Sequence, residues 1–378
     1  MNRKHLLTCL IAGGLLTPAL ATADWTLYGR AHLSADILDD GADYNEFNLS
    51  SNSSRLGFKG EREFREQLVA VFQIEQQVDF DTADDGGLTL ATRDTFVGLK
   101  GDDWGMLRIG KFDTPFKRAR GDANFFGDRV GDLRNLARSR AQTGRFDQRF
   151  NNSIHYRTPD FGGLTWDLQY SNETGDATTE DGAPNKGYST ALNLDMGDLS
   201  GALAYEKRED GAVDPDAFRA VLAYSITPAL RMAAFYQNSE TTNGDEADVY
   251  GLGGQFRLTP SLRLNGHLFQ LDSDLNEADA SMYAIGLEYR VDSDLRFYGD
   301  VAMVDNDDAS QLTPWGQARS AGPGGPPGRR RPPCRSACAT TSELQAGSAP
   351  ATRSAAAIVG PRRTTPRRGP FNCDELRM

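Results

Sequence analysis

Cysteine is absent from the long central part of the sequence, residues 24–312. Disulfide bonds therefore cannot hold that span together, and its fold depends on a packed core or on surrounding lipid. The 378-residue chain has four cysteines, Cys9, Cys334, Cys338 and Cys373. No further metal-ligating residues accompany the spaced pair Cys334 and Cys338, which disfavours a zinc site.

A long apolar run is also missing beyond the N-terminal segment. A membrane-spanning helix needs about 20 apolar residues, and no stretch after residue 23 approaches that length. The remaining choices are a protein outside the membrane or one that spans it as a closed barrel of strands. The single apolar run, Leu6–Leu20, follows Arg3 and Lys4 and ends in Ala21-Thr22-Ala23. This arrangement predicts a cleavable signal peptide over residues 1–23 and an exported protein.

Residues typical of catalytic and metal sites are scarce. None of the four histidines lies near a serine in a nucleophile-elbow context, and no His-Glu-x-x-His motif occurs. The acidic run Asp305-Asn306-Asp307-Asp308 lacks the glycine and the distal glutamate of a calcium-binding loop. We therefore predict no enzyme, no cofactor and no metal site.

Positive charge is concentrated at the two ends of the chain. Residues 313–378 hold eleven Lys or Arg and three Asp or Glu, while the predicted signal peptide carries a charge of +2. Since the whole chain has a formal charge of −12, residues 24–312 carry about −22. Such an acidic body argues against nucleic acid as a partner.

Short runs of alternating apolar and polar residues fill most of residues 24–304. In the first run, Trp25 and Leu27 occupy one face, and Tyr28 and Arg30 the other, as in a strand with one apolar side. A soluble sandwich also has alternating strands. Strands of about 9–11 residues, separated by short turns and longer acidic loops in turn, are instead typical of a bacterial transmembrane barrel. We predict fifteen strands, near residues 24–38, 47–61, 67–81, 89–100, 103–112, 150–158, 163–172, 188–197, 199–207, 217–226, 229–239, 247–257, 261–272, 281–291 and 294–304.

An odd number of strands does not fit a single-chain bacterial barrel, which closes with an even number. The missing strand should follow Val304, but no alternating run is visible there. Residues 313–378 are instead rich in Pro, Arg and Ala without periodicity, which predicts a disordered tail that does not belong to the barrel over residues 24–312. One hypothesis is a shifted reading frame near residues 315–320, which resequencing of the locus would test.

One long segment, Asp113–Arg149, interrupts the succession of strands. It has neither sustained alternation nor a helical stripe, and it holds nine Lys or Arg and five Asp, a net charge of +4. Loops beyond about 12–15 residues are uncommon in compact folds and are usually functional or disordered. We interpret this segment as a loop that folds into the lumen of the barrel and narrows it.

Five motifs lie in the predicted strands, at Trp25–Arg30, Ser54–Gly60, Ala70–Glu75, Thr92–Lys100 and Asn152–Leu164. Together they resemble the general porins of Gram-negative outer membranes. The resemblance is dense from Trp25 to Tyr170, weaker to about Val304 and absent beyond Trp315.

This resemblance implies a transmembrane, antiparallel up-and-down β-barrel of sixteen strands, usually trimeric, whose third outer loop folds inward to face a ladder of basic wall residues. The positions that match the ladder are Arg30, Arg55, Arg93 and Arg149. In the loop, Asp122, Asp128 and Asp132, beside Arg129, are the candidate counter-charges. Family members end in a strand with a C-terminal aromatic residue, whereas this chain ends in Met378.

The expected function is passive diffusion of small hydrophilic solutes and ions through a water-filled channel. Outer-membrane lipid and lipopolysaccharide are the expected surroundings. The basic loop favours an anion preference despite the acidic rim. A channel selective for anions or sugars, and a structural barrel or adhesin without a pore, remain as alternatives.

Overall fold

The structure, a computed structural model, describes most of residues 24–316 and two short strands beyond them. The predicted signal peptide and most of the predicted tail lie outside the described residues. The described ranges are 24–39, 45–65, 68–81, 93–138, 146–174, 185–209, 214–240, 243–310, 312–316, 334–339 and 341–346.

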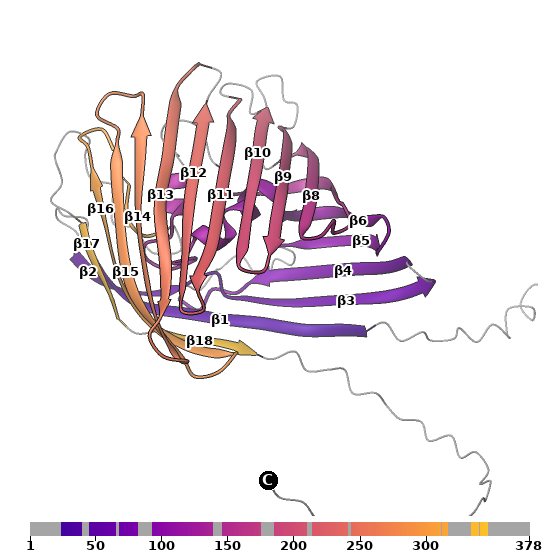
Figure 1. The fold of residues 1–378 in the computed structure, drawn as a ribbon, viewed down its shortest axis with the longest axis horizontal. Coiled ribbons are helices and arrows are strands. Elements are labelled where there is room, and N and C mark those ends of the chain that lie inside the picture. The colour runs from indigo at the N-terminus through magenta and orange to yellow at the C-terminus, as the bar shows by residue number, and fades with distance from the viewer. Residues whose placement is uncertain are drawn as a thin grey trace, which may run out of the picture.

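Strands form almost all of the described chain (Figure 1). Three short helical segments occur between the sixth and seventh strands, namely α1 (Pro115–Ala119), η1 (Gly121–Ala123) and α2 (Arg134–Ala137). No helix in the described ranges is long and apolar enough to cross a membrane. The strands are β1 (Asp24–Asp39), β2 (Asn45–Ser51), β3 (Arg55–Arg65), β4 (Leu68–Gln77), β5 (Thr95–Gly101), β6 (Gly105–Asp113), β7 (Arg149–Arg157), β8 (Leu164–Glu173), β9 (Lys186–Met196), β10 (Leu199–Glu209), β11 (Asp216–Thr227), β12 (Leu230–Glu240), β13 (Glu246–Arg257), β14 (Leu262–Ser273), β15 (Ala280–Arg290), β16 (Leu295–Asn306), β17 (Cys334–Ala339) and β18 (Thr341–Ala346).

The strands form one antiparallel up-and-down barrel, which confirms the predicted fold class. From β3 to β16, each strand pairs with the next along the chain. One edge of β1 pairs with β3 along its first half and with β2 along its second half. The predicted strand at 47–61 is therefore broken in two, because Ser53 turns the backbone with a φ of 58°.

Two short strands close the barrel where the sequence predicted a disordered tail. Both β17 and β18 lie between β16 and β1, with Val304 opposite Cys334 and Arg30 opposite Gln345. Since β2 with β3 and β17 with β18 each share one position, the 18 described strands occupy 16 positions. β17 and β18 thus take the place of the last strand, which the sequence did not reveal after Val304. The disordered tail over residues 313–378 stays a prediction. A closing strand is physically required, since an open edge leaves backbone groups unpaired in lipid.

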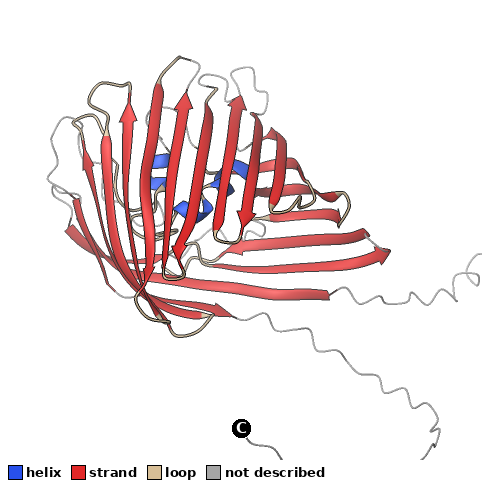
Figure 2. Cartoon of the chain, viewed as in Figure 1, coloured by secondary structure: helices blue, strands red, loops and turns tan. Residues whose placement is uncertain are grey.

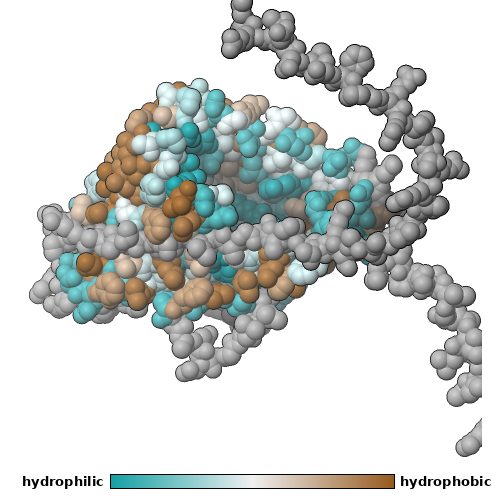
Figure 3. Space-filling view, turned by 90° about the horizontal axis from the view of Figure 1, so that it is seen from below, coloured by the Kyte–Doolittle hydropathy of each residue, from teal (hydrophilic) through white to brown (hydrophobic). Residues whose placement is uncertain are grey.

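The two faces of the barrel differ in polarity, as the alternation predicted. Outward side chains such as Val97, Ile109, Leu252 and Ile285 are more than half exposed. A water-soluble protein rarely exposes so many large apolar side chains side by side, whereas an outward apolar band is the pattern of a membrane barrel. Seen from below, hydrophilic residues gather in a hollow and apolar residues cover much of the flanks (Figure 3).

Candidate functional site

The segment between β6 and β7 folds into the barrel, which confirms the inward loop. We call residues 113–149 the constriction loop. Its helical parts lie within the curve of the sheet (Figure 2). The helix α1 begins after Thr114, whose hydroxyl accepts a hydrogen bond from the backbone N–H of Lys117 at 3.1 Å. Pro115 suits the first turn of the helix because that position has no intrahelical partner for an N–H. Residues 139–145 lie outside the described ranges.

An apolar area on the inner wall explains why the loop turns inward. On the inward face of β11, β12 and β13, side chains such as Val221, Phe235 and Val249 are buried and not exposed to water. Leu133 and Leu136 of the constriction loop cover this area. Each large apolar side chain removed from water contributes roughly 1.5–3 kcal/mol, so the covered wall holds the loop in place. At the start of the loop, Phe116 packs in a second cluster with alanines of β9, β10 and β11.

Charged side chains at the tip of the loop reach several strands. Asp122 accepts a hydrogen bond from Arg231 of β12 at 2.9 Å and another from Ser200 of β10. Arg129 lies 3.5 Å from Asp300 of β16, and its guanidinium stacks 4.5 Å from the ring centre of Tyr298. The tip is therefore fixed across the lumen by side chains of opposite charge.

Asp128 docks the loop on the first strands of the barrel. Its carboxylate lies 3.4 Å from Arg30 of β1 and accepts a hydrogen bond from Ser53 at 3.1 Å. Ser53 forms the break between β2 and β3, so this break lies where the loop docks. Burial raises the pKa of Asp128, but Arg134 and Arg30 outweigh burial and hold that pKa below its usual value.

Asp132 stabilises the loop from within. It accepts two hydrogen bonds from the Arg134 guanidinium, at 2.8 and 2.6 Å, and one from Asn124 at 3.0 Å. Burial opposes ionisation here too, but the Arg134 guanidinium lowers the pKa of Asp132 to about 2. Asp132 is thus a structural carboxylate within the loop, and it is not among the residues that line the cavity described next.

A polar cavity of about 370 Å³ lies between the loop tip and the barrel wall. On the loop side it is lined from Gly121 to Arg129, and on the wall side by strands β1, β12, β13, β15 and β16. Five arginines and three carboxylates line it, which gives a formal charge of +2 with His32 neutral. The charged residues are Arg30, Asp122, Asp128, Arg129, Arg231, Glu288, Arg290 and Arg296.

The four predicted wall arginines do not form one ladder along this cavity. Only Arg30 is among its lining residues. Arg93 pairs with Glu75 of β4 at 2.6 Å, and Arg55 lies 3.6 Å from the same carboxylate. A carboxylate of the wall itself thus lies beside both Arg55 and Arg93, and the basic ladder of the four arginines stays a prediction.

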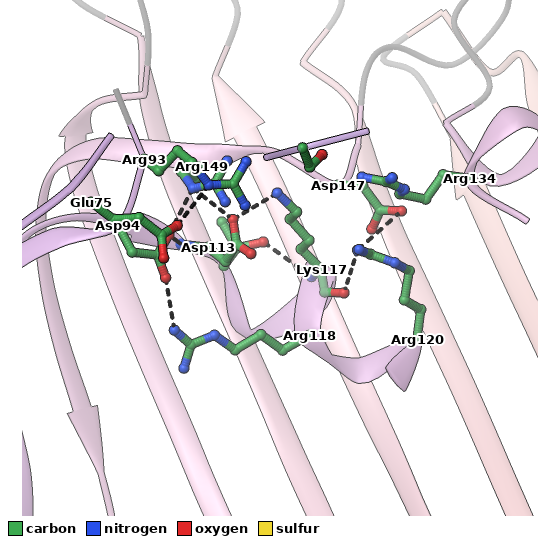
Figure 4. A network of polar contacts seen from close by, with 12 residues as sticks. Glu75, Arg93, Asp94, Asp113, Lys117, Arg118, Arg120, Arg134, Asp147 and Arg149 are labelled. Carbon is green, nitrogen blue, oxygen red and sulfur yellow. Dashed lines mark hydrogen bonds and ion pairs between the residues drawn. The ribbon is translucent and has the colours of Figure 1, made fainter. Parts of the chain in front are cut away.

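Arg149 belongs to an ion-pair network at the start of the loop. Its Nε lies 2.7 Å from Asp94 and 3.0 Å from Asp113, while Lys117 lies 2.6 Å from Asp113. These side chains gather beside α1 (Figure 4). Arg118 also reaches Asp94, at 3.4 Å. Through these pairs Arg149 anchors the start of the loop at the wall. It is not among the residues that line the cavity.

Three arginines that the sequence did not single out lie on the wall opposite the loop tip. They are Arg231, Arg290 and Arg296. The two-residue alternation places Arg290 and Arg296 on the polar face of their strands, so this pattern was the signal for them. It could not tell which inward positions lie at the depth of the loop. Within the described ranges, no cluster of three or more His, Cys, Asp or Glu could hold a metal ion.

Comparisons with known proteins agree with this geometry. The chain is 29% identical over 177 residues to the major outer membrane protein P.IB of Neisseria meningitidis serogroup B. This match covers 45% of this chain and 49% of that protein. It is 26% identical over 242 residues to an outer membrane porin protein of Bordetella pertussis, covering 54% and 59%. The chain thus spans about half the length of the Neisseria relatives that it matches.

Solved structures share the fold. An anion-selective porin from Comamonas acidovorans superposes with a TM-score of 0.73 at 21% identity, covering 85% of this chain and 99% of that chain. The trimer form of OmpT from Vibrio cholerae gives a TM-score of 0.63 at 15% identity, covering 85% and 99%. The family model described as Gram-negative porin matches residues 7–309. The chain therefore belongs to the Gram-negative porin family.

Proposed function

We propose that this chain forms a water-filled channel in the outer membrane of a Gram-negative bacterium, through which small hydrophilic solutes and ions diffuse passively. The observation that carries the proposal is the polar cavity of about 370 Å³ between the constriction loop and the inner wall of a barrel with an apolar outer face. A passive channel needs no catalytic residue. Its filter is physical, since the loop limits size and the facing charges set an ion preference.

Anion preference is the second candidate function, and one observation favours it. The lining of the cavity carries a formal charge of +2, which attracts anions into a narrow, partly desolvated passage. A sugar-selective channel would need a series of aromatic residues along the path. Among the described residues, the lining offers Phe125 and Tyr298 beside His32, which gives no support to that alternative.

We propose that the barrel assembles as a homotrimer in outer-membrane lipid that includes lipopolysaccharide. The apolar belt supports the contact with lipid, and the trimeric Vibrio structure supports the assembly by its fold alone. At the rim, acidic residues lie opposite each other on neighbouring strands. Asp216 lies opposite Glu240, and Asp248 lies opposite Asp272. Facing like charges are unfavourable, so divalent cations that bridge to lipid phosphate would stabilise this rim.

Planar-bilayer recording of the purified full chain tests the channel. We expect stepwise conductance that grows with salt concentration and does not saturate with one solute. Heat-modifiable migration of the same sample would report whether a closed barrel has formed. A closed barrel without conductance would leave a structural barrel or adhesin, and saturation by one solute would indicate a selective channel.

Chelation of divalent cations should weaken binding of lipopolysaccharide if the acidic rim acts as we propose.

A further inference from the structure

A second inward segment lies against the tip of the constriction loop. It comprises residues 312–316, which follow β16. Residue 312 is the last residue of the predicted barrel, and residues 313–316 belong to the predicted tail. The backbone N–H of Gly131 donates to the carbonyl of Pro314 at 2.6 Å. The described contacts of the loop therefore extend past residue 312, where the predicted barrel ended.

Trp315 is the main apolar contact of this segment. Its side chain is 3% exposed and packs in a cluster with Phe126 and Val130 of the constriction loop. The same cluster includes Ala284 of β15 and Ala302 of β16. The indole therefore shares a buried cluster with the loop tip and with the two strands that carry Glu288 and Tyr298 into the cavity.

The segment is itself fastened to the end of β16. The side-chain amide of Asn306 donates to the carbonyl of Leu312 at 2.8 Å, and its oxygen accepts from the N–H of Leu312 at 3.1 Å. Leu312 packs against the apolar cluster that contains Leu133 and Leu136. Leu312 and Trp315 thus each pack in an apolar cluster that contains residues of the loop.

The loop tip has no spare room at the wall. Gly131 has a φ of 79°, and a Cβ there would lie 2.6 Å from the Cβ of Ala284. Because the backbone is already in close contact with β15, the loop can move only away from that wall. Residues 312–316 oppose this movement, since Pro314 accepts the hydrogen bond from Gly131 and Trp315 shares a buried cluster with Val130.

We propose that Trp315 is a positioning residue for the constriction, which sets the width of the cavity by holding residues 126–131 against β15 and β16. Asp128 and Arg129, which line the cavity, lie within this held stretch. The inference rests on the proposed channel function, because the width of a closed cavity would have no consequence for transport. Trp315 itself is not among the lining residues of that cavity.

Replacing the indole tests the proposal. In Trp315→Ala the loop tip loses its apolar support, so we expect single-channel conductance to rise roughly 1.5-fold as one side of the water column recedes. Larger sugars should also enter liposomes faster in swelling assays. Trp315→Phe should restore the wild-type values, because the indole N–H finds no hydrogen-bond partner among the described residues. The matched control is Trp25→Ala, which removes an indole from the outer face.

The outcomes separate this inference from the proposed function. If the wild-type chain forms a closed barrel without conductance, the channel itself is wrong. If the wild type conducts and folded Trp315→Ala keeps wild-type conductance and size exclusion, the positioning role is wrong. Should Trp315→Ala fail to give a heat-modifiable barrel, Asn306→Ala replaces it, since it loosens the base of the segment and leaves the indole intact. Wild-type behaviour of Asn306→Ala would then overturn the proposal.

Discussion

Arg219 of β11 forms a fully buried ion pair with Asp147 of the constriction loop, with 2.8 Å between Arg219 Nη1 and Asp147 Oδ1. The same nitrogen donates to the carbonyl of Phe116 at 2.8 Å. Phe116 lies near the start of the loop and Asp147 near its end, so one guanidinium joins both to the wall. Gln237 of β12 accepts from the other nitrogens of this guanidinium, at 3.1 and 2.5 Å.

Removal of one partner of this pair should strongly destabilise the protein. Asp147→Ala leaves the Arg219 guanidinium buried without its carboxylate, and breaking a buried pair in this way costs about 3–5 kcal/mol. We expect a loss of that size in the free energy of unfolding, measured by urea titration of the barrel in detergent micelles.

A double variant is the control for this prediction. In Asp147→Leu with Arg219→Met both charges of the buried pair are replaced by apolar groups of similar size, so much of the stability should return. Arg120, which lies 3.7 Å from Asp147, loses only this longer contact. Equal losses in the single and double variants would show that the pair acts through packing and not through its charges.

The arginines that line the cavity should control ion selectivity. Replacing both Arg290 and Arg296 by Gln changes the formal charge of the lining from +2 to 0. The reversal potential in a salt gradient should therefore shift toward cations. The pair Arg55→Gln and Arg93→Gln should shift it in the same direction but less, because neither of these residues lines the cavity.

A distant lysine is the control for the selectivity test. Lys186 is the first residue of β9, is about half exposed and pairs with Glu209 at 3.6 Å. Lys186→Gln removes a positive charge away from the cavity, so the reversal potential should stay near the wild-type value. An unchanged reversal potential in the Arg290/Arg296 variant would count against our assignment of the selective passage.

Acid should loosen the constriction loop. The pKa of Asp132 is lowered to about 2 from an ordinary value of 3.8. Burial raises the pKa of Asp128 and of Asp147, but neighbouring arginines outweigh it and hold both pKa values below the ordinary value. A carboxylate with a lowered folded-state pKa contributes stability that is present above the unfolded value and is lost as pH falls through the folded value. Between pH 4 and pH 2 we therefore expect more open-channel noise and faster proteolysis within residues 113–149.

The variant Asp132→Asn provides the internal comparison for acid loosening. Since the amide carries no charge, the loop should already be noisier at pH 6, and the further increase on acidification should be smaller than in the wild type. A wild-type loop that is equally quiet at pH 6 and pH 2.5 would contradict the prediction.

The sequence by itself determined the strands, their polarity and the interruption between them. Two-residue alternation is a local property, so it indicates that Trp25 and Leu27 face outward and that Arg30 faces inward without knowledge of any neighbour. A long segment without such a pattern, Asp113–Arg149, stands out for the same reason. The alternation did not reveal the break at Ser53, whose positive φ lies where Asp128 docks.

The partners of each inward side chain were decided only by the tertiary structure. Arg219 and Asp147 are 72 residues apart in sequence, and the contact of Gly131 with Pro314 joins parts of the chain that are still more distant. Alternation shows which side of the wall a residue faces, but not how deep in the lumen it lies or whether a loop covers it. Closure of the barrel and inward folding of the loop fix that depth, so Arg290 and Arg296 line the cavity while Glu75 compensates Arg55 and Arg93.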